Sequence, residues 1–216
     1  MTDTAALRER AQDRYDDGLP YHSFSHVEDA MERADELLER CERHGIDVDT
    51  EVVRAALLFH DAGYHRDPEE DGFDSREALS ASIGRKELED AGMGSGTIDR
   101  VVDCIMATRP EATPHTTEDK IVRAADLSGL AGDYEEFLDD AGALREEYAY
   151  LHGERQPLQA WVEGVRRTLQ FYLAQDIHLT PEHDDGDESQ WHRAVRQNLE
   201  RFLDEHGHDD RAGGET

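Results

Sequence analysis

The chain has 216 residues and carries 52 acidic against 23 basic side chains, which gives a formal net charge of −29 at pH 7. This excess argues against polymeric nucleic acid and anionic membranes as partners, because both are bound through Lys and Arg that neutralise phosphates. An acidic disordered protein is the alternative, but a hydrophobic share of 37% with seven Tyr and six Phe suffices for a core. We therefore expect a folded, halophilic protein whose acidic surface is adapted to high salt.

The length fits one domain, which we place at residues 1–180, with an acidic linker, a last helix and a frayed tail in residues 181–216. Cys41 and Cys104 are isolated thiols without metal-type spacing, which suits a reducing compartment. No stretch is long and apolar enough to cross a bilayer, and the polar start lacks the apolar core of a secretion signal. We expect a cytoplasmic location.

Apolar residues recur at helical spacing along nearly the whole chain, separated by glycine, proline and capping residues. The expected helices cover residues 5–16, about 23–45, 50–59, 74–90, 97–109, a segment around 121–127 after the loop 110–117, 133–152, 156–175 and 190–205. The pattern indicates no convincing strand. The predicted fold class is all-α, a single compact helical bundle.

The most apolar run in the chain is residues 52–59, and His60 and Asp61 follow it directly. A helix apolar on almost all faces is expected at the centre of a core, so the two polar residues at its end need partners. One alternative is a histidine bonded to a backbone carbonyl with Asp61 capping the next turn. The other is a divalent cation, because a neutral imidazole and a carboxylate can both ligate one ion.

Three segments around that dipeptide carry a family resemblance. HSFSHVEDAMERADELL, ALLFHDAGY and IVRAADLSGL present a single His, a His-Asp pair and a single Asp in order. Over about residues 20–150 the chain resembles the HD superfamily of metal-dependent phosphohydrolases. The resemblance implies an all-α bundle of the HD-domain type and action on phosphorylated substrates. It also implies the metal ligands, which are His26, His60, Asp61 and Asp126.

Within that superfamily the chain is most similar to small stand-alone HD proteins. The matching elements are Tyr21-His22 before the first ligand, the acidic helix start at 74–81, Ala107-Thr108-Arg109, and, loosely, Arg145-Glu146-Glu147-Tyr148. Relatives often place a histidine just after the third element, where this chain has Pro110 and Glu111, with His115 further along. A second metal held by extra histidines is therefore not expected.

The resemblance also assigns catalytic and substrate-binding roles. Asp61 and Glu77 are the expected catalytic residues, Glu77 as a base or as an acid that orients water. Asp74 and Glu77 also have the spacing of a capping box, which would explain both without catalysis.

His22, Thr108 and Arg109 are the expected substrate-binding residues. His22 shares a helix face with His26, although a capping or tyrosine-supporting role would also explain it. Arg109 could clamp a phosphate with its planar donor fork, or stabilise the end of its helix. Arg123 shares a helix face with Asp126, and a simple pairing with Asp119 is its alternative.

The expected cofactor is one divalent metal ion, and two His with two carboxylates accept Mn, Fe, Co, Ni, Zn or Mg. The leading hypothesis is a metal-dependent hydrolase that cleaves a small phosphorylated substrate, with nucleotides among the candidates, by attack of metal-activated water. The alternatives are a non-catalytic metal- or nucleotide-binding regulatory HD module and a purely structural bundle. The sequence leaves the substrate and any homo-oligomer open.

Overall fold

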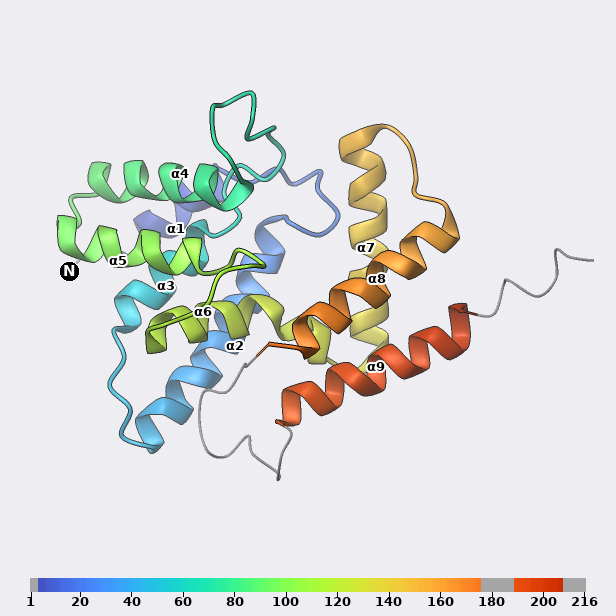
Figure 1. The fold of residues 1–216 in the computed structure, drawn as a ribbon. Coiled ribbons are helices and arrows are strands. Elements are labelled where there is room, and N and C mark those ends of the chain that lie inside the picture. The colour runs from blue at the N-terminus through green and yellow to red at the C-terminus, as the bar shows by residue number, and fades with distance from the viewer. Residues whose placement is uncertain (1–3, 176–188, 208–216) are drawn as a thin grey trace, which may run out of the picture. The chain divides into compact units, whose positions relative to one another are not determined.

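Helices form where apolar residues recur three and four positions apart in the sequence. The computed structural model describes residues 4–175 and 189–207 (Figure 1). In chain order the helices are α1 (Thr4–Gln12), α2 (Phe24–Arg43), α3 (Thr50–Phe59), α4 (Arg76–Asp90), α5 (Ser95–Met106), α6 (Thr117–Asp126), the 3-10 helix η1 (Leu127–Ala131), α7 (Tyr134–His152), α8 (Leu158–Leu173) and α9 (Gln190–His206). No β-strand occurs among the described residues, so the predicted all-α class is confirmed. None of these helices is both long and apolar enough to cross a bilayer.

The chain divides into two compact units, residues 1–126 and 127–216. The first unit contains α1 to α6, and the second contains η1 and α7 to α9. The sequence predicted a different division, with one domain over residues 1–180 and an appended segment over 181–216. The boundary predicted there, most of the acidic linker and the tail beyond residue 207 lie outside the described residues.

The last helix is part of the core of the second unit, because its apolar face is buried against α7 and α8. Phe202 of α9 packs edge to face on Phe137 of α7, with ring centroids 5.9 Å apart, and on Trp161 of α8 at 5.1 Å. The indole Nε1–H of Trp161 donates to the carbonyl of Ala141 on α7 over 3.0 Å. Hydrophobic contact of α9 with both neighbouring helices explains why the division does not fall before it.

Helix α3 lies at the centre of the first unit, as its apolar run predicted. Its buried residues are Val52, Val53, Ala55, Ala56, Leu57, Leu58 and Phe59. It packs against all five other helices of the unit. Gly84 lets α4 approach closely, since a Cβ there would lie 3.1 Å from Cβ of Phe59. The residues directly after α3 are therefore held by packing on several sides.

At the starts of two helices, α3 and α4, the residue that caps the helix is not the one that the sequence indicates. Asp49, not Thr50, caps α3, and its side chain accepts from the backbone N–H groups of Glu51 and Val52. Ser75 caps α4 by accepting from the N–H of Ala78 over 3.1 Å. The Asp74–Glu77 capping box, one of the two explanations that the sequence left open for these residues, is therefore wrong, since Ser75 and not Asp74 caps α4.

Candidate metal centre

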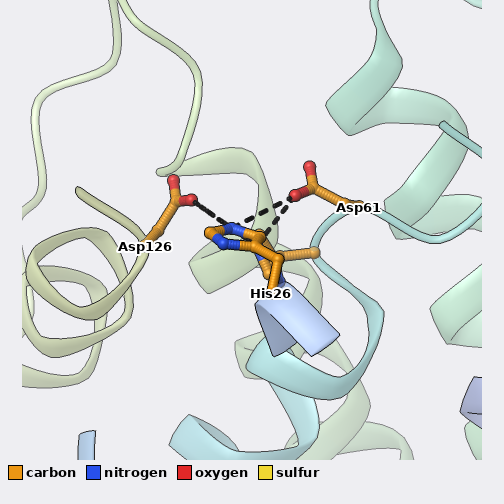
Figure 2. A group of neighbouring side chains, drawn as sticks. His26, Asp61 and Asp126 are labelled. Atoms are coloured by element: carbon orange, nitrogen blue, oxygen red, sulfur yellow. Dashed lines mark hydrogen bonds and ion pairs between the residues drawn. The ribbon is translucent and has the colours of Figure 1, made fainter. Parts of the chain in front are cut away.

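Three helix ends of the first unit bring four polar residues together. His26 lies in the first turn of α2, His60 and Asp61 directly follow α3, and Asp126 is the last residue of α6. Helices α2, α3 and α6 all pack against one another, so these ends meet although the residues lie up to 100 positions apart. Figure 2 shows the His26 ring between the Asp61 and Asp126 carboxylates.

The four side chains converge at the distances expected of ligands to one ion. The Nε2 atom of His60 lies 2.9 Å from Asp61 Oδ2, 3.4 Å from His26 Nε2 and 3.5 Å from Asp126 Oδ1. The Nε2 atom of His26 lies 3.4 Å from Asp126 Oδ1 and 3.7 Å from Asp61 Oδ2. One potential ligand atom from each residue lies within 4.8 Å of the others.

The backbone fixes which nitrogen of His60 faces the cluster. His60 is 1% exposed, and its Nδ1 lies 2.8 Å from the carbonyl of Leu57. A carbonyl accepts only, so Nδ1 carries the hydrogen and donates it. In the neutral ring Nε2 then presents its lone pair to the cluster. A hydrogen bond of this kind from the far nitrogen orients metal-binding histidines.

Electrostatics at the cluster favour bound positive charge. Burial by itself would lower the pKa of His60, but the carboxylates of Asp61 and Asp126 outweigh it and hold that pKa well above its usual range. Burial would raise the pKa of Asp61 and of Asp126, but His60 and the other neighbouring imidazoles outweigh it and hold both below their usual range. Two carboxylates and two histidines therefore surround a position that attracts a cation.

The donor atoms fit a divalent ion. Two ligands at about 2.1 Å from one ion, 90° to 110° apart, are separated by about 3.0 to 3.4 Å, near the distances in this cluster. Asp61 Oδ2 is buried and accepts no hydrogen bond within the described residues. A carboxylate oxygen buried in this way, beside imidazole lone pairs, needs a cation or a proton. The set of two nitrogens and two oxygens suits several divalent metals.

His22 lies beside this cluster. Its ring centroid is 5.9 Å from that of His26, and its ring stacks on Tyr64 at 3.6 Å with an interplanar angle of 13°. The guanidinium of Arg76 covers the Tyr64 ring at 4.3 Å. His22 precedes α2, which begins at Phe24, so the prediction that it shares a helix face with His26 is wrong. It contacts a tyrosine, as one predicted alternative has it, and also lies near the candidate metal ligands.

Arg109 and Glu77 lie close to each other, and Thr108 precedes Arg109 in the chain. Arg109 lies 3.4 Å from Asp74 and 4.0 Å from Glu77, so the structure brings the predicted phosphate clamp and the predicted base together. Thr108 is buried, and its hydroxyl donates to the carbonyl of Ile105 over 2.8 Å. Within the described residues, Arg109 pairs with Glu77 and two other carboxylates, Thr108 bonds to backbone, and none of the three makes a polar side-chain contact with the four clustered residues.

Arg123 has a role that the sequence did not reveal. Its side chain is 2% exposed and donates to four backbone carbonyls of the loop after α5. These bonds reach Ala107 at 2.9 Å, Arg109 at 2.6 Å, Pro110 at 2.9 Å and Ala112 at 3.4 Å. The sequence-based alternative, a pairing of Arg123 with Asp119, did not include these bonds to the loop. The position of Arg123 on the inner face of α6 was the only signal available in the sequence.

Comparison with known proteins adds no relative to this description. Neither the protein-family models nor the curated protein sequences contain a match to the chain. The candidate site is thus defined by its own geometry and by the residue pattern from which it was predicted.

Proposed function

We propose that the chain is a metal-dependent hydrolase of the HD type that cleaves a small phosphorylated substrate with metal-activated water. The observation that carries this proposal is the convergence of His26, His60, Asp61 and Asp126, far apart in sequence, within 4.8 Å. Convergence of two histidines and two aspartates in this chain order supports the resemblance to the HD superfamily.

The four residues would hold one divalent cation. Such a cation, when bound, lowers the pKa of coordinated water and stabilises charge on a phosphoryl oxygen. His60 would bind through Nε2, in the tautomer that its bond to Leu57 selects. Asp61 and Asp126 supply the negative charge that balances a divalent ion, while His22 lies beside His26 at the edge of the cluster.

Arg109 and Glu77 supply the remaining chemistry of the proposal. Arg109 would hold phosphate oxygens through its planar donor fork, exchanging its carboxylate contacts with Asp74 and Glu111 for the substrate. Glu77 would accept a proton from the attacking water or orient it. The 4.0 Å separation of Arg109 and Glu77 allows one substrate to lie near both groups.

Metal analysis of freshly purified protein is the first test. We expect one divalent ion per chain, because four ligands converge on one position. His60→Ala and Asp61→Ala should each abolish metal binding and turnover, since each removes a ligand. Turnover is measured as phosphate released from a panel of nucleotides and sugar phosphates in molar KCl with Mn, Co, Ni or Mg.

His44→Ala is the matched control. His44 caps the C-terminal end of α2, whereas His26 lies in its first turn, and His44 is not part of the cluster. It should keep the metal and the activity of the wild type. Wild-type protein that retains no metal, or that releases no phosphate with any of these ions, would contradict the hydrolase proposal.

A second candidate is a non-catalytic regulatory module that binds metal and a nucleotide. The observation that favours it is the charged group around Arg109, where Glu77 has an ion partner that explains it without catalysis. Glu77→Gln separates the two functions. In the hydrolase this variant keeps metal and substrate binding and loses turnover, whereas in the regulatory module the wild type itself binds tightly and never turns over.

A further inference from the structure

The end of helix α3 has backbone groups that the helix itself cannot satisfy. The last carbonyls of any helix need partners from outside the regular hydrogen-bonding pattern. The Nδ1–H of His60 donates to the carbonyl of Leu57, and the N–H of Ala62 donates to the carbonyl of Phe59 over 3.1 Å. The carbonyl of Leu58 accepts from the hydroxyl of Tyr15 over 3.1 Å. Tyr15 therefore helps to close the helix from which His60 and Asp61 emerge.

Tyr15 also contacts the helix that carries the first histidine of the cluster. Its ring packs edge to face on Phe24, with centroids 5.5 Å apart, and Phe24 is the first residue of α2, two positions before His26. The Tyr15 side chain is 9% exposed, and its pKa is raised by burial first and then by the nearby Asp61 carboxylate. One buried side chain thus touches both elements whose ends carry the two histidines.

The residue before Tyr15 binds the far side of the same turn. The carbonyl of Arg14 accepts from the N–H of Gly63 over 2.9 Å. Gly63 has φ of +79°, and a Cβ there would lie 2.6 Å from Cδ1 of Ile83, so the turn after Asp61 is tightly confined. Bonds from residues 14 and 15 therefore hold the His60–Asp61 dipeptide on both sides.

The N-terminal segment is itself anchored at a buried carboxylate. Glu87 of α4 is 3% exposed and pairs with Arg10 at 3.1 Å and Arg14 at 2.7 Å. Ala11 and Leu7 of α1 are buried as well. Residues 4–15 are therefore held against the rest of the first unit, next to the turn that contains His60 and Asp61.

From these contacts we propose that Tyr15 is a positioning residue of the metal centre, which holds the His60–Asp61 turn and the start of α2 in the geometry that binds the ion. The inference rests on the proposed function and extends it, because residue 15 lies outside residues 20–150, where the chain resembles HD proteins. Residues that hydrogen-bond to metal ligands commonly matter for affinity: their mutation weakens metal binding by about ten- to a hundredfold.

The test is Tyr15→Phe, which removes the hydroxyl and keeps the ring against Phe24. We expect the dissociation constant for Co²⁺, titrated into the metal-free full-length protein, to rise by about tenfold. The visible absorption bands of bound Co²⁺ should also change, because the ligands His60 and Asp61 move. In the metal-free protein, the imidazole nitrogen signals of His60 should shift and the amide of Gly63 should exchange faster with solvent.

Tyr134→Phe is the matched control. Tyr134 of the second unit is 8% exposed, and its hydroxyl donates to Glu205 over 2.8 Å, so the variant loses a similar bond between two residues of that unit, neither of which belongs to the cluster. It should leave the Co²⁺ affinity and spectrum unchanged. The inference is overturned if Tyr15→Phe keeps wild-type affinity, spectrum and His60 signals while losing only as much thermal stability as Tyr134→Phe.

The outcomes also separate this inference from the proposed function. Wild-type protein that binds no Co²⁺ contradicts the metal-dependent hydrolase, while a changed His60 signal in Tyr15→Phe would still support the positioning role. Wild-type protein that binds Co²⁺ normally, with unchanged Tyr15→Phe, supports the metal centre and rejects the role of Tyr15.

Discussion

Single residues with buried polar groups determine the geometry around the candidate centre. His60 is oriented by one carbonyl, and Arg123 holds a whole loop by donating to four. A buried guanidinium is tolerated only when its donors are satisfied, because unpaired charge in the interior is costly. The loop that carries Arg109 thus depends on a residue of α6, the same helix that supplies Asp126.

Arg123→Ala should lower the free energy of unfolding by about 3 kcal/mol or more, because it leaves several buried carbonyls without donors. Arg123→Lys should recover part of the loss, since a single ammonium cannot reach all of them. The measurement is urea denaturation followed by circular dichroism. Arg85→Ala, which breaks an exposed ion pair with Asp99, should cost no more than about 1 kcal/mol. Equal losses in the two alanine variants would show that the loop does not depend on Arg123.

At the scale of the helices, hydrogen bonds at the helix ends position the residues around the candidate metal centre. Helix α3 ends just before His60, and its terminal carbonyls are taken by an imidazole, a phenol and a backbone N–H. Helix α4 begins after Ser75 rather than at Asp74, which leaves Asp74 beside Arg109. Because Ser75 caps the helix, the carboxylate of Asp74 is not used as a cap and can pair with Arg109.

Ser75→Ala should lower the free energy of unfolding by about 1 kcal/mol, because it removes the acceptor for the N–H of Ala78. Asp74→Ala should change it by less than about 0.5 kcal/mol, since that side chain is largely exposed and caps no helix. Thermal and urea unfolding of the two variants check this difference. A larger loss for Asp74→Ala would restore the capping box that the sequence predicted.

For the whole molecule, the net charge of −29 is the dominant feature. Many exposed acidic groups repel one another, and salt screens this repulsion over a distance of about 10 Å at 0.1 M. The cluster of two His and two Asp would differ from the rest of this acidic chain, because a divalent ion there would neutralise its two carboxylates. A negative surface would concentrate divalent cations and slow the approach of anionic substrates.

Raising KCl from dilute buffer to molar concentration should therefore increase both the free energy of unfolding and the rate of phosphate release. The physical reason is screening of like charges within the protein and between protein and substrate. Unfolding followed by circular dichroism and initial rates over a KCl series measure the two effects. Activity that peaks in dilute buffer and declines steadily with salt would contradict the halophilic interpretation.

Local patterns in the sequence were enough to predict the helices, whereas the four clustered residues were predicted from the family resemblance. Helical periodicity depends on near neighbours in the chain, so the all-α class and the buried α3 could be predicted without tertiary information. The His-Asp pair at the end of an apolar run indicated buried polar groups that need partners. The resemblance then singled out His26 and Asp126, which the structure brings to the same place.

The remaining features could not be predicted from the sequence, because the contacts that produce them join residues distant in the chain. Tyr15 meets the carbonyl of Leu58 across 43 positions, and Arg123 meets the loop carbonyls across 11 to 16. The neighbouring sequence of Tyr15 and of Arg123 contains no pattern that would predict these hydrogen bonds. The amino-acid pattern was sufficient to indicate the helices, and together with the family resemblance it indicated which residues could bind a metal. Packing determined the boundary between the two units and the residues that contact the His60–Asp61 turn, since both depend on which surfaces are buried together.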